Sequence, residues 1–366
     1  MPRLLKSPPT DLHDHLRLIR SRGIGPISYR HLMQRFGSAS EAIAMIPELA
    51  RRGRGRPPRL ADPREVEAEM REVERHGAHY LLIGTPAYPA LLAEIDGAPP
   101  VITVKGRSDL LDRPAIAMVG ARNASAAACR FARQLAHDLG GAGQVVVSGL
   151  ARGIDSAAHD GALPTGTVAV IAGGIDIAYP PENAARQEDI AEQGLVVAEM
   201  PPGTKPTARH FPNRNRIISG LCAGTVVVEA APRSGSLITA RLAGEQGREV
   251  MAVPGSPLDP RARGCNGLIR DGAVLVQDVE DVLATLRPID ARMEHVAEER
   301  APAPIAEDVD AAASERVEAL LGPVAVGVDE IIRQSGLTPP EVQLALLELD
   351  LGGRLDRHAG GKVSLR

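Results

Sequence analysis

The chain has 366 residues, of which 44% are hydrophobic and 2% aromatic, and its formal net charge is −4 at pH 7. A chain of this length is too long to fold around one ordinary hydrophobic core, so two or three domains are predicted. The negative net charge excludes a protein whose whole surface is positively charged. Any nucleic-acid site must therefore be local, and the low aromatic content disfavours a platform on which bases stack.

Cysteine usage and the N-terminus bear on where the protein works. The three cysteines, Cys129, Cys222 and Cys265, are far apart and without His-rich neighbours, which favours buried small hydrophobes over a disulfide or a zinc site. The first fifteen residues lack the apolar core of a signal peptide, and no stretch approaches the ~18 apolar residues of a membrane span. These features predict a cytoplasmic protein without a membrane partner.

Residues 1–76 are predicted to form a small helical domain. A helical pattern runs from Asp11 to about Glu48, and its glycine turn at residues 23–26 resembles a helix-hairpin-helix element, whose amides can meet a phosphate. A plain turn in a helical bundle explains the pattern equally well. Five arginines between Arg51 and Arg59 read as a basic loop, which in most proteins is only solvated, and a helix is expected from about Pro63 to His76.

Residues 77–286 are predicted to form the main domain. Seven short apolar runs recur with helix-like segments between most of them: AIAMVG, QVVVSG, TVAVIAGG, LVVAEM, GTVVVEA, REVMAVPG and AVLVQ. Continuous apolar strands alternating with helices indicate an α/β fold with a doubly wound, mostly parallel, Rossmann-like sheet covered on both faces. The runs between His79 and Lys105 extend this sheet at one edge.

The C-terminal part is predicted to be a linker followed by a further small domain. Residues 287–312 are rich in Pro, Ala and acids without an apolar period, which is typical of a linker. Residues 313–366 contain three helical segments and a two-strand ribbon, as in a winged helix. The segment from Pro339 to Leu351 takes the recognition position, but it carries three acids and no Lys or Arg, so protein contact or a structural role is favoured over DNA reading.

The ends of the predicted strands carry the candidate binding residues. In an open α/β sheet, ligands bind beyond the carboxyl ends of the strands, where helix N-termini present free amides. Glycine lets the backbone approach an anion, serine donates a hydroxyl bond, and arginine supplies a fork of donors matched to phosphate. We expect Asn213 and Asn215 to cap the helix that carries two of these arginines. The candidates are Gly120, Arg122, Ser125, Ser148, Gly149, Arg152, Gly153, Lys205, Arg214, Asn215, Arg216, Ser234, Gly235 and Ser236.

Motifs for catalysis and cofactor binding are weak or absent. The chain lacks G-x-G-x-x-G after the first strand and also lacks G-x-x-x-x-G-K-[ST], so no dinucleotide, NTP or other cofactor is predicted. Asp155 and His159 lie four residues apart, where a helix cap and a solvated pair suffice, and no nucleophile and base assemble. No catalytic residue and no metal site is therefore predicted.

Three stretches carry a family resemblance. SGLARGIDSAAH, FPNRNRIISGL and VVVEAAPRSGSLITARLAGEQGREVMAVPG resemble the DNA-processing protein A (DprA/Smf) family across residues 114–276. The resemblance implies a dimeric, non-enzymatic binder of single-stranded DNA that helps load the RecA recombinase, against single-strand-binding protein, in natural transformation. It also places Arg122, residues 214–216 and residues 234–240 in family motifs, with Arg122 at DNA phosphate.

One departure and two alternatives remain. Many relatives carry a basic residue near the Tyr-Pro of the third loop, but residues 179–183 contain none, so a DNA contact there is in doubt. The run GTVVVEA, with Glu229, also resembles nucleoside-monophosphate phosphoribohydrolases, which makes a nucleotide-binding enzyme the alternative function. An interaction scaffold that senses a small anion is the third hypothesis.

Overall fold

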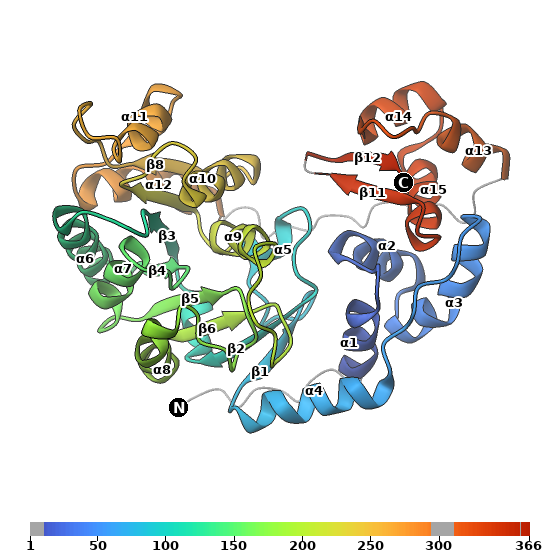
Figure 1. Ribbon diagram of the computed structural model, residues 1–366, viewed down its shortest axis with the longest axis horizontal. Coiled ribbons are helices and arrows are strands. Elements are labelled where there is room, and N and C mark those ends of the chain that lie inside the picture. The colour runs from blue at the N-terminus through green and yellow to red at the C-terminus, as the bar shows by residue number, and fades with distance from the viewer. Residues whose placement is uncertain (1–10, 294–310, 359) are drawn as a thin grey trace. The chain divides into compact units, whose positions relative to one another are not determined.

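The computed structural model describes residues 11–293, 311–358 and 360–366 (Figure 1). By its contacts the chain divides into two compact units: residues 69–299 form one, and residues 1–68 together with 300–366 form the other. The first ten residues and most of the predicted linker lie outside the described residues. Each unit has its own hydrophobic core.

The larger unit is built on one nine-stranded sheet with the order β1-β2-β6-β5-β4-β3-β7-β8-β9. Strands β3 to β9 pair in parallel, whereas β1 and β2 are antiparallel additions that join the sheet beside β6. The predicted doubly wound, mostly parallel sheet with an extended edge is confirmed. The strands are β1 (His79–Leu82), β2 (Val101–Gly106), β3 (Ala115–Gly120), β4 (Val145–Ser148), β5 (Thr167–Ile171), β6 (Leu195–Ala198), β7 (Gly224–Val228), β8 (Glu249–Ala252) and β9 (Val274–Leu275).

The central strands are mostly apolar on both faces because both faces of the sheet are covered. On β3, Ala117 and Val119 join the core on one face, while Ile116 and Met118 join the core on the other. Helices α5 (Ala90–Glu94), α9 (His210–Gly220), α10 (Gly235–Glu245) and α11 (Arg263–Arg270) contribute to the first core, and α6 (Ala126–Gly141), α7 (Ile154–Ala162) and α12 (Val279–Met293) to the second. The remaining helices of this region are α8 (Ala184–Gln193) and α4 (Pro63–Arg75), with short 3-10 turns η1 (Ser108–Asp112) and η2 (Pro181–Asn183).

The cysteines and the predicted linker can be compared with this fold. Cys222 and Cys265 are buried, as predicted, whereas Cys129 is only half-buried; all three thiols are free. Helix α12 continues to Met293, so the segment expected to begin the linker at residue 287 starts as helix. Proline is the least favoured residue inside a helix, yet α12 continues past the proline at residue 288.

The smaller unit combines an N-terminal helical part and a winged helix. The N-terminal part consists of α1 (Leu12–Arg20), α2 (Pro26–Phe36) and α3 (Ala39–Arg52). The Ser38 hydroxyl caps α3 by accepting a hydrogen bond from the Glu41 amide. The winged helix consists of α13 (Ala311–Ala319), β10 (Val326–Gly327), α14 (Val328–Ser335), α15 (Pro339–Leu351), β11 (Leu355–His358) and β12 (Lys362–Leu365), with the sheet order β10-β12-β11.

Helix α15, in the recognition position, is buried on two sides. Leu346 and Leu349 belong to the winged-helix core, while Leu344, Leu347 and Leu351 are buried outside that core, and α15 contacts both α2 and α3. The Ser28 hydroxyl of α2 donates to Asp350 across this contact, at 2.6 Å. A helix with leucines on more than one side needs cover on more than one side, so α15 has a structural role in this unit.

Candidate nucleic-acid interface

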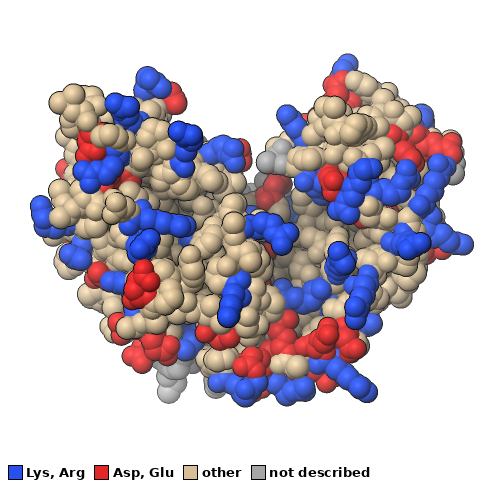
Figure 2. Space-filling view, in the orientation of Figure 1, with Lys and Arg blue, Asp and Glu red and all other residues tan. Residues whose placement is uncertain are grey.

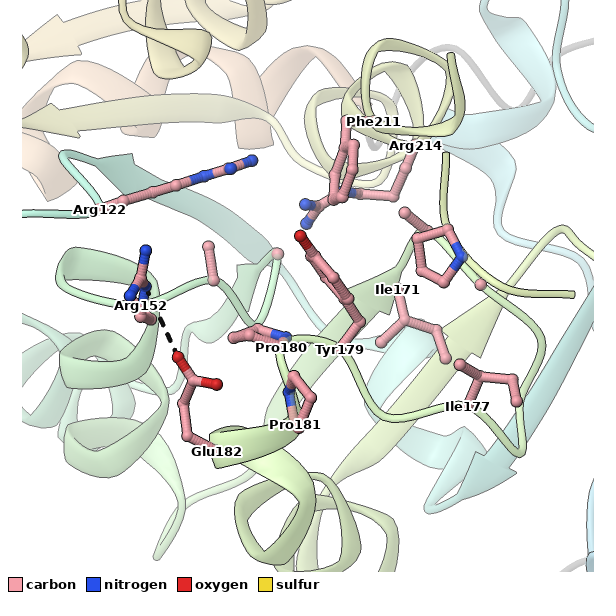
Figure 3. Close-up of a pocket in the computed structure, with 15 residues that line it drawn as sticks. Arg122, Arg152, Ile171, Ile177, Tyr179, Pro180, Pro181, Glu182, Phe211 and Arg214 are labelled. Atoms are coloured by element: carbon pink, nitrogen blue, oxygen red, sulfur yellow. Dashed lines mark ion pairs between the residues drawn. The ribbon is translucent and has the colours of Figure 1, made fainter. Parts of the chain in front are cut away.

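A pocket of about 260 Å³ opens at the carboxyl ends of β3, β4 and β5 (Figure 3). Its charged lining consists of three arginines and one acid, contributed by the loops after β3 and β4, the η2 turn and helix α9. These residues are Arg122, Arg152, Arg214 and Glu182. The sheet therefore brings three of the predicted arginines to one site.

Arg122 reaches the pocket because the chain turns tightly after β3. A Cβ at Gly120 would lie 2.0 Å from the Val228 carbonyl oxygen and 2.5 Å from Ile154 Cγ1, so only glycine fits there. Arg122 follows as an exposed residue, and its guanidinium carbon lies 5.2 Å from the centre of the Phe211 ring, within the range of a cation–π contact. Figure 3 shows Arg122 and Phe211 projecting into the same space.

Arg152 lies on the loop after β4. Its side chain is 65% exposed, and its Nε is 3.7 Å from a carboxylate oxygen of Glu182 (Figure 3). At this exposure and distance the ion pair is weak. The guanidinium of Arg152 is therefore available to a phosphate.

An aromatic pair forms another wall of the pocket. The rings of Tyr179 and Phe211 are 5.5 Å apart between centroids and tilted by 53°, and Tyr179 is 45% exposed. The low aromatic content predicted no stacking platform, yet two of the seven Phe and Tyr residues meet here. Tyr179 lies in the loop after β5 and Phe211 at the start of FPNRNRIISGL, and no periodicity in the sequence links them. Their meeting places an apolar, stackable surface beside the arginines.

Arg214 forms the floor of the pocket and is almost completely buried. It is 6% exposed, and its Nη1 donates to the Val170 carbonyl oxygen at 3.1 Å, while its Nε has no hydrogen-bond partner among the described residues. Burial lowers its pKa to about 10, so it stays protonated at neutral pH. A Cβ at Gly149 would lie only 1.6 Å from Arg214 Nη1, so this glycine makes room for the guanidinium.

Asp155 stands beside Arg214 and organises the loop after β4. One oxygen of its carboxylate accepts the amides of Gly149 (3.1 Å) and Ala151 (3.3 Å). Burial raises its pKa, and the positive charge of Arg214 opposes that rise. The prediction of a solvated pair with His159 is wrong, because α7 packs both side chains into the interior, where they are 6% and 1% exposed.

His159 is a structural residue of the second core. Its Nδ1–H donates to the Thr167 hydroxyl at 2.8 Å, since that hydroxyl itself donates to the Val146 carbonyl at 2.7 Å. Its Nε2 is buried and has no hydrogen-bond partner among the described residues. Burial lowers its pKa to about 3, so the ring is neutral at pH 7, and His159 does not line the pocket.

Two predicted contact residues point away from the pocket. Ser148 is fully buried, and its hydroxyl donates to the Met118 carbonyl at 2.6 Å, so the predicted ligand contact is corrected to a bond inside the sheet. Arg216 pairs with Glu199 at 2.5 Å, with each side chain 16% exposed. Residues two apart on a helix do not share a face, which is why Arg216 leaves the pocket that Arg214 enters.

The predicted asparagine caps are absent. Helix α9 begins at His210, so Asn213 and Asn215 lie inside it rather than at its start, and the capping prediction is wrong. The Asn215 side-chain amide instead contacts the Gly235 carbonyl oxygen at 3.5 Å. This contact ties α9 to the start of α10.

The remaining predicted residues surround these elements. Ser125 caps α6 by accepting the Ala128 amide at 3.1 Å, and Ser234 accepts the amide of Ser236, itself buried, at 3.4 Å. Gly153 has a left-handed φ of 76° and starts α7, and Lys205 is exposed.

Glu229 is occupied by structural contacts. One carboxylate oxygen accepts the Ser125 amide at 2.7 Å, and the other lies 3.6 Å from Arg261 Nε. Its side chain is 11% exposed and does not line the pocket. Glu229 therefore holds the loop after β3 in place, and the geometry gives no support to its use as a catalytic acid or base.

Neither a metal site nor a membrane span is found. Among residues 11–293, 311–358 and 360–366, no group of His, Cys, Asp and Glu side chains is arranged to hold a metal ion. No helix in those ranges has the length and apolar character needed to cross a bilayer.

Fold and site together define a Rossmann-like protein in which arginines line the carboxyl edge of a doubly wound sheet. The chain belongs to the DNA recombination-mediator protein A (DprA) family, whose model matches residues 79–287. The model of the DprA-like N-terminal HHH domain matches residues 9–71, and that of the DprA winged helix domain matches residues 299–361.

Individual relatives agree with this assignment. The chain is 37% identical to Protein Smf of Escherichia coli over 311 residues, which cover 84% of this chain and 83% of Smf. It is 48% identical to the DNA processing protein DprA of Streptococcus pneumoniae over 199 residues, 54% of this chain and 70% of that protein.

Two solved structures are similar in fold as well. The X-ray structure of S. pneumoniae DprA has a TM-score of 0.58 at 43% identity, covering 61% of this chain and 78% of that one. A Helicobacter pylori DprA structure, described for its single-stranded DNA binding mode, has a TM-score of 0.53 at 28% identity, covering 58% of this chain and 97% of that one.

Proposed function

We propose that this protein binds single-stranded DNA in the pocket at the carboxyl edge of the sheet, without catalysing a reaction on it. The observation that carries the proposal is the convergence of Arg122, Arg152 and Arg214, from three separate elements, beside the Tyr179–Phe211 pair. Guanidinium groups match phosphate, and aromatic rings match the faces of unpaired bases. A duplex keeps its bases paired and offers no such face.

The three arginines of the pocket would have different roles in binding. Arg122 and Arg152 are exposed and can follow a phosphate backbone, whereas Arg214 supplies a fixed positive charge from the floor. Because Arg214 is already ordered by Val170 and Asp155, little side-chain entropy is lost when an anion arrives. Binding should therefore tolerate many sequences and weaken as salt rises.

The test removes the two exposed arginines. Arg122→Ala/Arg152→Ala should weaken binding of a short oligo-dT by about tenfold or more and reduce the slope of log K against log salt by about 1.4, at about 0.7 per phosphate contact. The control Arg130→Ala/Arg241→Ala removes the same charge from exposed positions on α6 and α10 and should change neither value. Unchanged affinity in the first variant, with folding intact, would refute the site.

The aromatic wall has its own test. Phe211→Ala should cost about 1–3 kcal/mol of binding free energy for an oligonucleotide, by the usual value of base stacking. An abasic oligonucleotide should be insensitive to the change, because it has no base to stack. Equal losses for both ligands would show that Phe211 only holds Arg122 in place.

We extend the proposal to recombination. By its resemblance to the family, the bound strand would be handed to the RecA recombinase in competition with single-strand-binding protein, during natural transformation. The measurement is the DNA-dependent ATPase rate of RecA on strands already covered by single-strand-binding protein. The wild-type chain should shorten the lag, and Arg122→Ala/Arg152→Ala should not.

A homodimer is part of the same proposal. Strand β9 is the last strand of the sheet, and Val274 and Leu275 on it are 37% and 40% exposed. An apolar edge strand is a ready template for pairing with a second copy. Two copies would place two pockets on one strand of DNA and raise the effective concentration of each for the strand.

A further inference from the structure

The helical N-terminal part has a charge opposite to that of the whole chain. Residues 11–61 contain ten arginines and four acids, Asp11, Asp14, Glu41 and Glu48, a net charge of +6 in a chain whose total is −4. The remaining residues therefore sum to −10. Figure 2 shows Lys and Arg side chains spread over the part formed by α1 to α3. Such asymmetry within one chain is typical of a local site for a polyanion.

The glycine turn and the basic loop, far apart in the sequence, lie against each other. The Arg22 amide donates to the Arg59 carbonyl oxygen at 3.2 Å, and the Ala61 amide donates to the Ser21 hydroxyl at 2.9 Å. Arg17 Nε also donates to the Ala61 carbonyl at 3.2 Å. The end of the basic loop is thereby fixed beside the turn between α1 and α2.

The other end of the basic loop is fixed to the winged helix. A Cβ at Gly53 would lie 2.0 Å from the Glu348 carbonyl oxygen, and one at Gly55 would lie 1.9 Å from that of Gly352. Between these glycines, Arg54 Nη2 pairs with Glu315 at 2.5 Å. The basic loop is thus held at both ends. Helix α15 and the residue after it, Gly352, pack against the loop and support it.

Three arginines of this surface are free to bind. Arg22, Arg56 and Arg59 are exposed, and none forms an ion pair with a residue of the described ranges. Gly25, in the turn beside Arg22, has open space where a Cβ would stand, so the backbone there is accessible as well. The nearby aromatic side chains, Tyr29 and Phe36, are buried and half-buried. The surface therefore offers contacts to phosphates but no ring on which a base could stack.

We propose that Arg22, Arg56 and Arg59 form a second nucleic-acid site, which binds the phosphate backbone of double-stranded DNA. A duplex presents about one charge per 1.7 Å of its axis and hides its bases, which matches a surface of arginines without aromatic rings. The pocket on the sheet has the opposite character, since it combines arginines with an aromatic pair. One chain would then hold single-stranded and double-stranded DNA at separate sites.

The test uses the full chain and a relaxed, covalently closed circular duplex, which has no single-stranded ends or loops. Arg22→Ala/Arg56→Ala/Arg59→Ala should lower duplex affinity about tenfold or more and reduce the salt slope by about 2.7, at about 0.9 per phosphate contact. The control Arg316→Ala/Arg333→Ala/Arg366→Ala removes the same charge from exposed winged-helix positions and should leave duplex binding as in the wild type.

Two further measurements distinguish binding at this second site from binding in the pocket. Short oligo-dT should bind the triple variant with wild-type affinity, whereas Arg122→Ala/Arg152→Ala should lose oligo-dT and keep the duplex. The triple Arg→Lys variant at residues 22, 56 and 59 should retain most duplex binding, which also verifies that the surface still folds. Duplex affinity equal to that of the control, or an equal loss of oligo-dT, would overturn the second site while leaving the pocket untouched.

Discussion

The substitution Gly149→Ala tests how the floor of the pocket is built. The new methyl carbon would stand 1.6 Å from Arg214 Nη1, 2.5 Å from Arg214 Cζ and 2.8 Å from an Asp155 carboxylate oxygen. No real Cβ tolerates such contacts, so the guanidinium must leave its place. Arg214 is 6% exposed, and its guanidinium must give up its bond to the Val170 carbonyl oxygen when it leaves the floor of the pocket.

The magnitude follows from what Arg214 loses. Its hydrogen bond to the Val170 carbonyl is charge-assisted, and such bonds contribute about 1.5–3 kcal/mol. Overpacking of a tight site adds about 1–3 kcal/mol. We therefore expect the free energy of unfolding to fall by roughly 3–5 kcal/mol. Oligo-dT affinity should fall as well, because the displaced charge no longer faces the ligand.

The assay is urea unfolding followed by circular dichroism, with Gly235→Ala as the matched control. A Cβ at Gly235 meets no atom within 4 Å, and this residue opens α10, so the control should change stability by less than about 1 kcal/mol. In an Arg214→Ala background, Gly149→Ala should cost at least about 2 kcal/mol less, since the clash is gone. If Gly149→Ala is as stable as Gly235→Ala, the described packing of the floor is wrong.

Other predictions concern acid stability and assembly. The folded-state pKa of His159, about 3, lies below the ordinary 6.5, so its contribution to stability is present above pH 6.5 and is lost as pH falls toward 3. Between pH 7 and pH 4 this loss amounts to about 3 kcal/mol. His159→Asn should therefore reduce the change in unfolding free energy over this pH range by that amount, whereas the exposed control His137→Asn should not. The same pH dependence in both variants would contradict the lowered pKa of His159. Val274→Lys/Leu275→Lys should yield monomers by light scattering at a concentration where the wild type and Val324→Lys are dimers, and a persistent dimer would place the interface elsewhere.

Much of the fold was predictable because the strands of a covered parallel sheet are mostly apolar on both faces. A run such as AIAMVG predicts a buried strand from its own residues, without information from the rest of the chain. The rule that ligands bind at the carboxyl ends of such strands then located Arg122, Gly149, Arg152 and Arg214 at one edge. Helix boundaries were less accessible: α9 starts at His210, and that shift turned Asn213 and Asn215 from expected caps into interior residues.

Helix α15 of the winged helix carries a second signal in its sequence. Its three acids and its lack of basic residues disfavour DNA reading. Its leucines, however, lie on more than one side of the helix, which predicts burial on more than one side. Which partner covers the second side could not be inferred, because the contacting helices α2 and α3 lie about three hundred residues earlier in the chain.

The sequence by itself determined the class of fold, the arginine- and glycine-rich character of the strand ends, and the family. These depend on local patterns of apolar, glycine and arginine residues. Only the tertiary structure decided which side chains share a site. It turned Arg216 toward Glu199, brought Tyr179 to Phe211, and laid the loop of Arg59 against the turn of Arg22. The physical reason is that such contacts join segments distant in the chain, and their geometry is set by packing, which no local pattern encodes.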